Sequence, residues 1–235
     1  MATILLTGAS RGIGAAARTA LTRAGCTVIG QSTSGEDGLI KADFAQARAA
    51  DAVWAEAIAR APGGRIDVLV NNAGVFEAVD IDDSDEAFAA TWARSHAINL
   101  QSAADLCRHA VKHFRNHGGG RIVNVASRAG NRGDSPRHWH YAAAKGGMIA
   151  MTKSIARGYA AQGILAFAVA PGFTMTGMAE DYLASRGGDK LLADIPLGRV
   201  ASADEVAEVV RWLAMDAPPS LTGATLDVNG ASYVR

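Results

Sequence analysis

The chain has 235 residues, of which 49% are hydrophobic and 20% charged, as in a globular protein with a sizeable core. Lysine plus arginine and aspartate plus glutamate both number 23, so no net charge attracts nucleic acid or an anionic membrane. Two cysteines, Cys26 and Cys107, are too few for a disulfide framework or a metal-ligand cluster. We therefore expect a protein without a metal site in a reducing compartment, the cytoplasm. No apolar run reaches the ~20 residues of a membrane-spanning helix, and the first residues do not resemble a signal peptide.

Short apolar runs alternate along the chain with longer, alanine-rich amphipathic stretches. The predicted strands are 3–7, 27–30, 39–42, 67–71, 121–125, 164–169 and 224–228. The predicted helices are 12–24, 45–60, 86–115, 140–161 and 203–214. Continuous apolar strands separated by helices are typical of a parallel sheet covered on both faces. The sequence thus predicts one α/β domain over residues 1–235, with a doubly wound parallel sheet of the Rossmann type.

Two local features refine this prediction. Only the segment "QSTSGEDG" separates the second and third strands, although parallel strands are usually connected through a helix. Either that helix is reduced to a turn, or one of the two strand predictions is wrong. The last helix has a clear start, because Ser202-Ala-Asp-Glu205 has the pattern of a capping box.

A glycine-rich segment, "TGASRGIG" at 7–14, follows the first strand directly. Its glycines Gly8, Gly12 and Gly14 would let the backbone approach a pyrophosphate at the positive end of a helix. Tight turns also need glycine for steric reasons, and methyltransferases and other nucleotide-binding proteins use similar loops. The loop alone therefore indicates a nucleotide site without fixing the reaction.

The stretch "HYAAAKGG" at 140–147 places Tyr141 and Lys145 four residues apart among alanines. Alanine favours a helix, on which both side chains share one face. They are then either a half-buried ring beside a cation that reaches solvent, or a phenol whose pKa the cation lowers toward the range of a general acid or base.

Further motifs decide between these interpretations. "NNAG" stands at 71–74, "PGFTMT" at 171–176, and Asn99 and Ser127 precede the Tyr141–Lys145 pair. With the glycine loop, this order resembles the classical short-chain dehydrogenase/reductase family over nearly the whole chain. General likeness, including "GRIVNVAS" and "GATLDVNGASY", resembles the 3-oxoacyl-[acyl-carrier-protein] reductases of that family.

The resemblance implies a catalytic tetrad of Asn99, Ser127, Tyr141 and Lys145. Ser127 would polarise a carbonyl, and Tyr141 would transfer a proton to or from the oxygen. Lys145 would lower the pKa of Tyr141 and hold the nicotinamide ribose. Asn99 would lie at a helix bulge, where its main chain anchors a water. Taken singly, Asn99 also fits a polar helix face and Ser127 a turn at a strand end.

The resemblance also implies a dinucleotide site. Its expected residues are Gly8, Ser10, Arg11, Gly12, Ile13, Gly14, Thr33, Asp43, Phe44, Asn71, Ala73, Gly74, Tyr141, Lys145, Pro171, Gly172, Thr174 and Thr176. An acidic residue after the second strand would select NAD, but the chain reads Gln31-Ser-Thr-Ser34 there, with no carboxylate before Glu36. Arg11 suits a 2′-phosphate unless it is simply a surface residue, so we expect NADP, with NAD possible.

Residues 174–197 are expected to form the mobile substrate lid of the family. "RHWHY" before the catalytic tyrosine is unusual, and Trp139 would line a substrate pocket or a subunit contact. His138 and His140 lack the further ligands of a metal site. The family commonly forms homotetramers through its two long central helices and its last strand.

The leading hypothesis is an NADP-dependent oxidoreductase acting on a small carbonyl or secondary alcohol substrate. The alternatives are a 3-oxoacyl-[acyl-carrier-protein] reductase of fatty-acid synthesis, a non-catalytic NADP-binding sensor or scaffold, and a methyltransferase, which leaves Tyr141 and Lys145 unexplained. An acidic carrier needs a basic surface near the site, for which Lys112, His113, Arg115 and His117 are candidates. The acidic segment "VFEAVDIDD" after "NNAG" opposes carrier binding.

Overall fold

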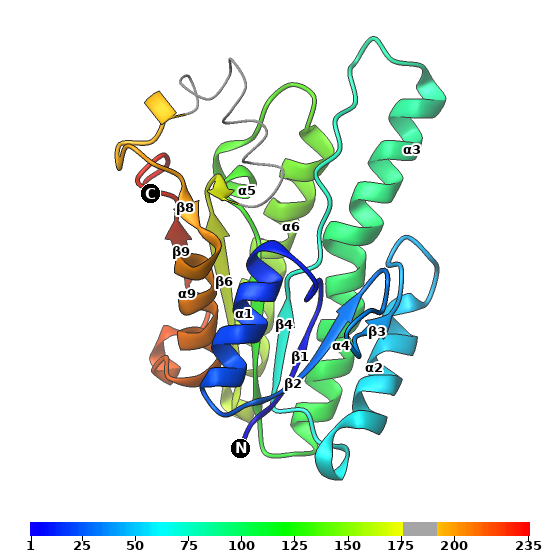
Figure 1. The fold of residues 1–235 in the computed structure, drawn as a ribbon, viewed down its shortest axis with the longest axis vertical. Helices are drawn as coiled ribbons and strands as arrows, with labels where there is room; N and C mark the ends of the chain where they lie inside the picture. The colour runs from blue at the N-terminus through cyan, green and yellow to red at the C-terminus, as the bar shows by residue number, and fades with distance from the viewer. Residues whose placement is uncertain (176–191) are drawn as a thin grey trace.

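A computed structural model describes residues 1–175 and 192–235 of the chain. Within them, seven strands form one sheet in the order β3-β2-β1-β4-β5-β6-β9, and every neighbouring pair is parallel (Figure 1). The strands are β1 (Thr3–Leu6), β2 (Thr27–Ser32), β3 (Ile40–Lys41), β4 (Val68–Asn71), β5 (Gly120–Val125), β6 (Ile164–Pro171) and β9 (Thr225–Val228). The predicted doubly wound sheet of the Rossmann type is confirmed.

Helices cover both faces of this sheet (Figure 1). They are α1 (Gly12–Arg23), α2 (Ala49–Arg60), α3 (Asp85–His96), α4 (Ser102–Arg115), α5 (Ala129–Arg132), α6 (Trp139–Tyr159) and α9 (Ala203–Met215). Short 3₁₀ turns lie at Pro62–Gly64, Ala160–Gln162 and Pro219–Leu221. The capping box predicted for α9 is present, because Ser202 accepts from the Glu205 amide and Glu205 accepts from the Ser202 amide.

The strands are apolar throughout because both faces are buried. On β1, Ile4 and Leu6 belong to the core cluster under α1 and α9, whereas Leu5 belongs to the cluster under α2 and α4. All three side chains are fully buried. Successive side chains of a strand point to opposite faces, so one short apolar run supplies both cores.

Two boundaries differ from the sequence prediction, and one question that the sequence left open is decided. The predicted helix 86–115 is divided by a π-helical turn, η2 (Ala97–Gln101), between α3 and α4. Helix α2 begins at Ala49 and not at residue 45, because Arg48 adopts a left-handed conformation with φ of 64°. The connection between β2 and β3 is a turn without a helix, so the short-connection interpretation is confirmed and both strands are real.

A second, two-stranded sheet joins β7 (Thr174–Met175) to β8 (Ala201–Ser202). These strands lie beside the carboxyl edge of the large sheet and flank the segment for which a lid is predicted. Residues 176–191 of that segment, including Thr176, lie outside the described residues.

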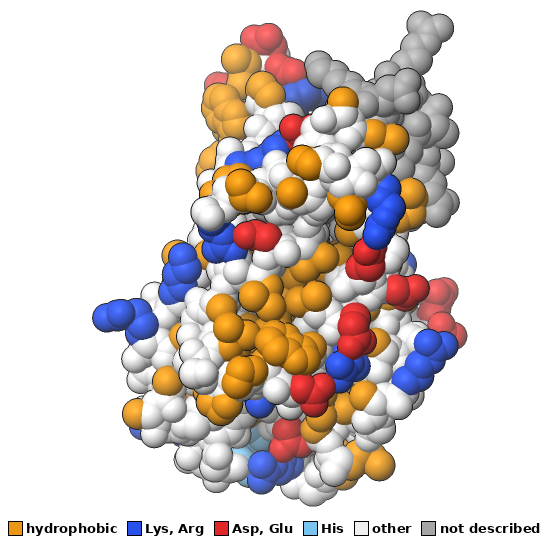
Figure 2. Space-filling model, turned by 90° about the vertical axis from the view of Figure 1, so that its left-hand side faces the viewer, with side chains coloured by type: hydrophobic (Ala, Val, Ile, Leu, Met, Phe, Trp, Pro, Cys, Tyr) orange, Lys and Arg blue, Asp and Glu red, His pale blue; other side chains and the backbone are white. Residues whose placement is uncertain are grey.

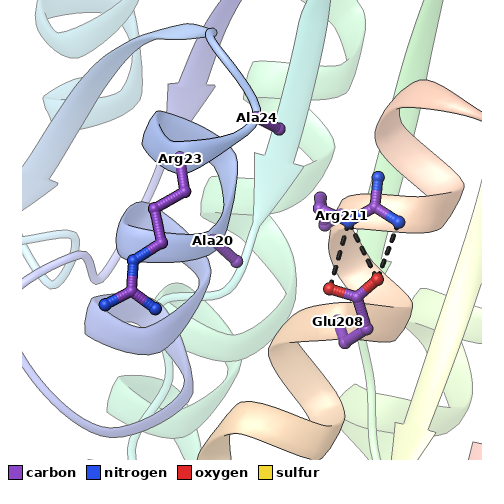
Figure 3. Close-up of a pocket in the computed structure, with 5 residues that line it drawn as sticks. All are labelled: Ala20, Arg23, Ala24, Glu208 and Arg211. Carbon is purple, nitrogen blue, oxygen red and sulfur yellow. Dashed lines mark hydrogen bonds and ion pairs between the residues drawn. The ribbon is translucent and has the colours of Figure 1, made fainter.

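A shallow depression lies between α1 and α9, at the edge of the sheet where β1 begins (Figure 3). Ala20, Arg23 and Ala24 of α1 line one side, and Glu208 and Arg211, joined as an ion pair at 2.7 Å, line the other. None of these residues is a predicted site residue. No helix of the described residues is long and apolar enough to cross a membrane.

The basic cluster at the end of α4 lies at this same amino-terminal edge. His113 accepts a hydrogen bond from the amide of Ile66, which lies two residues before β4. The expectation that Lys112, His113, Arg115 and His117 form a basic surface near the site is therefore wrong. The cause is helix length, since Arg115 follows Asn99 by about 24 Å of helix axis.

The same histidine generates a prediction about stability. Burial, and secondly His117, lower the pKa of His113, whose Nε2 must stay unprotonated to accept from Ile66. Below the unfolded pKa of about 6.5, His113 binds a proton when the chain unfolds. Its contribution to the free energy of unfolding is therefore fully present above that pH and is lost as the pH falls. We predict that His113→Gln, which keeps an acceptor, flattens the decline of the unfolding free energy between pH 7 and 5. Urea titrations would measure it, and an undiminished decline would contradict the prediction.

Candidate active site

The glycine-rich loop between β1 and α1 leaves no room for a Cβ at Gly8 or Gly14. Gly8 and Gly12 have φ of 64° and 52°, and a Cβ on Gly14 would lie 1.9 Å from the carbonyl oxygen of Gly8. Arg11 is the N-cap residue of α1, and its side chain makes no capping hydrogen bond. The first amides of α1 thus lack a side-chain cap, and the loop fits a pyrophosphate at the helix N-terminus.

Three side chains that the sequence analysis missed hold this loop in place. The hydroxyl of Thr7 accepts from the amides of Asn72 and Ala73, both at 3.0 Å. The Asn72 side chain donates to the carbonyls of Thr7 and Gly8. Gln31, at the end of β2, accepts from the Gly8 amide at 3.0 Å. The loop is therefore fastened to both neighbouring strands.

Asn71, which the sequence analysis named in place of Asn72, has its side chain in the core. It is 2% exposed and donates to Asn124 at 2.8 Å. Strand alternation requires the two asparagines of "NNAG" to point in different directions. Strand alternation could have predicted from the sequence that one asparagine faces the glycine loop, but not that it is Asn72.

The predicted bulge at Asn99 is present as the π-helical turn η2. Asn99 is fully buried, and its side chain bonds both main-chain polar groups of Val75. Oδ1 accepts from the Val75 amide and Nδ2 donates to the Val75 carbonyl, each at 3.0 Å. The side chain thereby fixes the loop that follows β4.

Gly74 in this loop marks the centre of the site. A Cβ on Gly74 would lie 2.9 Å from Asn99 Oδ1 and 3.6 Å from Lys145 Nζ. Lys145 is 3% exposed, donates to the Val125 carbonyl at 2.9 Å, and lies with Nζ 5.8 Å from the ring centre of Tyr141. Ser127 is near enough to Tyr141 to lower the pKa of its phenol. All four predicted catalytic residues thus gather at the carboxyl edge of β4 and β5.

The electrostatics of the pair differ from expectation. Burial raises the pKa of Tyr141 to about 12, opposed by the hydrogen bond from Ser127. Burial lowers the pKa of Lys145 to about 8. The expectation that Lys145 lowers the pKa of Tyr141 is therefore wrong for this structure, because Lys145 directs its hydrogen bond to Val125 and burial is the larger effect. Tyr141 is held as a protonated phenol, the form that donates a proton.

The remaining predicted cofactor residues surround the same edge. Ser10, Arg11 and Thr33 are exposed, and Asp43 accepts from the Ala45 amide at 2.9 Å. Phe44 is 7% exposed, with its ring in the core. The other described positions, which lie on the glycine loop, on the loop after β4 and at the end of β6, are Ile13, Ala73, Pro171, Gly172 and Thr174.

Aromatic residues border the catalytic tyrosine. Phe76 stacks on His138 with ring centres 3.8 Å apart, and it meets Tyr141 edge-on at 4.9 Å. Trp139 is 51% exposed. Across residues 1–175 and 192–235, no group of three or more His, Cys, Asp or Glu is placed to hold a metal ion.

Known proteins are similar to this chain over nearly its whole length. A family model described as "Enoyl-(Acyl carrier protein) reductase" matches residues 8–231. The chain is 36% identical to the 3-oxoacyl-[acyl-carrier-protein] reductase FabG of Escherichia coli (strain K12), covering 98% of this chain and 96% of that protein. It is 37% identical to the 3-oxoacyl-[acyl-carrier-protein] reductase of Synechocystis sp. (strain ATCC 27184 / PCC 6803 / Kazusa), covering 96% and 94%.

A solved structure is similar over the same length. It is a putative NAD(P)-dependent gluconate 5-dehydrogenase from Beutenbergia cavernae with bound NADP at low occupancy. The TM-score is 0.88 at 30% identity, and the match covers 98% of this chain and 96% of the other.

Sheet, loop and tetrad together define a dinucleotide-dependent oxidoreductase. The chain belongs to the short-chain dehydrogenase/reductase family. It is an NAD(P)-dependent enzyme that acts on CH–OH and C=O groups, and the sensor, scaffold and methyltransferase alternatives are set aside.

The chain's own residues account for the proton part of this chemistry. The nicotinamide supplies or takes up the hydride when bound. We expect Ser127 to donate to the substrate oxygen, and Tyr141 to protonate that oxygen in reduction or to accept its proton in oxidation. Lys145 and Asn99 meet at Gly74, and Lys145 Nζ lies 5.8 Å from the ring centre of Tyr141.

We predict that Tyr141→Phe removes the transferable proton and lowers kcat by about 10²–10⁴-fold, with NADPH affinity nearly unchanged. Tyr159→Phe, on the same helix α6 and remote from Ser127, is the matched control. Steady-state kinetics with fluorescence titration of NADPH measure both quantities. Near wild-type turnover in Tyr141→Phe would exclude this role.

Proposed function

We propose that this protein is an NADPH-dependent reductase of small carbonyl compounds, and in reverse an alcohol dehydrogenase. The observation that carries the proposal is the gathering of four groups, because Ser127 acts on the pKa of Tyr141 and Lys145 and Asn99 meet beside them at Gly74. NADPH consumption over a panel of ketones, including a 3-oxoacyl thioester, tests it. Absence of turnover on every member of the panel would contradict the proposal.

The proposed preference for NADP rests on the end of β2. The residue there, Gln31, is engaged with the glycine loop and carries no charge. Ser32 bonds the Gly35 amide at 3.0 Å, and the carbons of Lys41 lie against Gly35. Arg11 is exposed at the start of α1. A 2′-phosphate at this position would meet cations, whereas an unphosphorylated ribose would find no carboxylate at the strand end.

We predict that Arg11→Ala weakens NADPH binding about tenfold and leaves NADH binding nearly unchanged, because it removes a charge-assisted contact to the 2′-phosphate. Arg23→Ala is the control, since Arg23 lies at the other end of α1 in the depression of Figure 3. Calorimetric or fluorescence titrations give the four dissociation constants. Equal losses for both cofactors would remove Arg11 from this role.

A 3-oxoacyl-[acyl-carrier-protein] reductase is the second candidate, because relatives with that name are 34–37% identical to this chain. The charge at the site mouth speaks against a carrier-bound substrate. Glu77 and Asp80 follow Phe76 and pair with Arg94 and Arg137, and the exposed Asp82 and Asp83 follow them. An acidic carrier would approach this acidic rim against electrostatic repulsion.

We predict no strong preference for the carrier-bound form of a 3-oxoacyl group. The measurement compares kcat/KM for the same acyl group on the carrier and on a short thiol. A carrier advantage of about a hundredfold, or roughly 2.7 kcal/mol of transition-state binding, would contradict the prediction and favour the fatty-acid reductase.

The proposed assembly is a homotetramer in the cytoplasm. Figure 2, turned toward the side where α9 and β9 lie in Figure 1, shows hydrophobic side chains gathered in the middle of this face. Val209 and Trp212 on α9 and Leu226 and Val228 on β9 are partly buried hydrophobic residues that pack against the core. Strand β9 pairs only with β6, which leaves its other edge free among the described residues.

We predict a mass of four chains at micromolar concentration, with Trp212→Glu lowering it by placing charge in the apolar face. Multi-angle light scattering measures both. A single-chain mass for the wild-type protein would rule out the proposed assembly.

A further inference from the structure

A buried hydrogen-bond chain lies behind the catalytic tyrosine. His140, the residue directly before Tyr141 on α6, is 1% exposed, and its Nδ1 lies 3.0 Å from the hydroxyl of Ser95 on α3. Ser95 is also 1% exposed, and its hydroxyl accepts from Asn99 Nδ2 at 3.0 Å. The chain therefore runs from the residue beside the proton donor to the amide at the π-helical turn.

The far end of this chain fixes the centre of the site. The Asn99 amide bonds both main-chain polar groups of Val75, and its Oδ1 lies next to Gly74. A shift of this amide would move the loop that faces Lys145. Asn99 keeps its orientation through Ser95, whose hydroxyl would rotate freely without a second partner. His140 is that second partner.

Filling space does not explain a histidine here. The Nε2 atom of His140 is buried near the main chain of Glu77 without a hydrogen bond of normal geometry. An unpaired ring nitrogen is unfavourable in the core, where an apolar side chain would pack without that cost. The gain that offsets it is the hydrogen bond of Nδ1 to Ser95.

We propose that His140 is a positioning residue of the oxidoreductase reaction: through Ser95 it orients Asn99 and so holds loop 73–75 in register with Tyr141 and Lys145. Because His140 is covalently joined to Tyr141, the same contact also fixes the start of α6 against α3 and η2. The kinetic consequence rests on the proposed function, whereas the structural consequence does not.

The first test uses the protein without cofactor or substrate. Hydrogen–deuterium exchange of the Val75 amide, which donates to Asn99, reports on the orientation of Asn99. We expect exchange about fivefold or more faster in His140→Leu and Ser95→Ala. His140→Asn, which keeps a polar group near the position of Nδ1, should restore slow exchange. Ser102→Ala is the matched control, because the hydroxyl of buried Ser102 donates to the Ile98 carbonyl and has no bond to Ser95 or His140 among the described residues. Unchanged Val75 exchange in His140→Leu would overturn the proposal.

The second test is kinetic, on the best carbonyl substrate of the wild-type enzyme. We expect kcat to fall about tenfold in His140→Leu and Ser95→Ala, with KM for NADPH within about twofold and most of the rate recovered in His140→Asn. The double variant should lose no more than either single variant, because both interrupt one chain. Losses that multiply, or an equal loss in Ser102→Ala, would overturn the proposal. If the wild-type protein reduces no carbonyl compound, the proposed function fails and the exchange experiment still decides the role of His140.

Discussion

The close approach of three backbone segments at the carboxyl ends of β1 and β4 is the constraint on which the site depends. Gly14 meets the Gly8 carbonyl, and Gly8 in turn lies against Ala73, at distances that exclude any Cβ. Thr7 and Asn72 hold this contact with four hydrogen bonds. Contact at this distance aligns the start of α1 with the loop after β4. The glycine loop and the loop after β4, which carry many of the predicted cofactor residues, therefore form one compact platform.

Asn99 and Lys145 contact that platform at Gly74, in the loop after β4. The side-chain amide of Asn99 bonds both main-chain polar groups of Val75, as the backbone of a neighbouring strand would do. A regular helix would carry this side chain past the loop, and the π-helical turn η2 corrects its direction. Lys145 enters the same space from α6. Burial raises the pKa of Tyr141 to about 12 and lowers the pKa of Lys145 to about 8, so it favours the uncharged form of both side chains. A ligand that binds next to them would shift both pKa values.

Specificity within this family depends on the surroundings of the tetrad, and here those surroundings are acidic and aromatic. Phe76 and His138 border Tyr141, and the loop that carries Phe76 continues into Asp80, Asp82 and Asp83. The proposed preference for carrier-free substrates rests on this rim, which would oppose an acidic carrier, whereas the tetrad agrees with either substrate. Sequence similarity to relatives in the sheet and helices does not predict the residues of the rim. Packing constrains the residues of the core, whereas surface loops are free to vary.

The sequence by itself determined the sheet, the motifs and the four residues that are predicted to be catalytic. Apolar runs such as Ile4–Leu6 can only be buried on both faces, and glycine spacing and helical register follow from covalent geometry. Only the tertiary structure decided which asparagine of "NNAG" faces the loop. It also placed Lys112–His117 at the amino-terminal edge of the sheet, away from the site, and made burial the largest effect on the pKa of Tyr141. The chain His140–Ser95–Asn99 was equally hidden, because Ser95 and His140 are 45 residues apart. These outcomes depend on distances between segments remote in sequence, and local patterns carry no information about such distances.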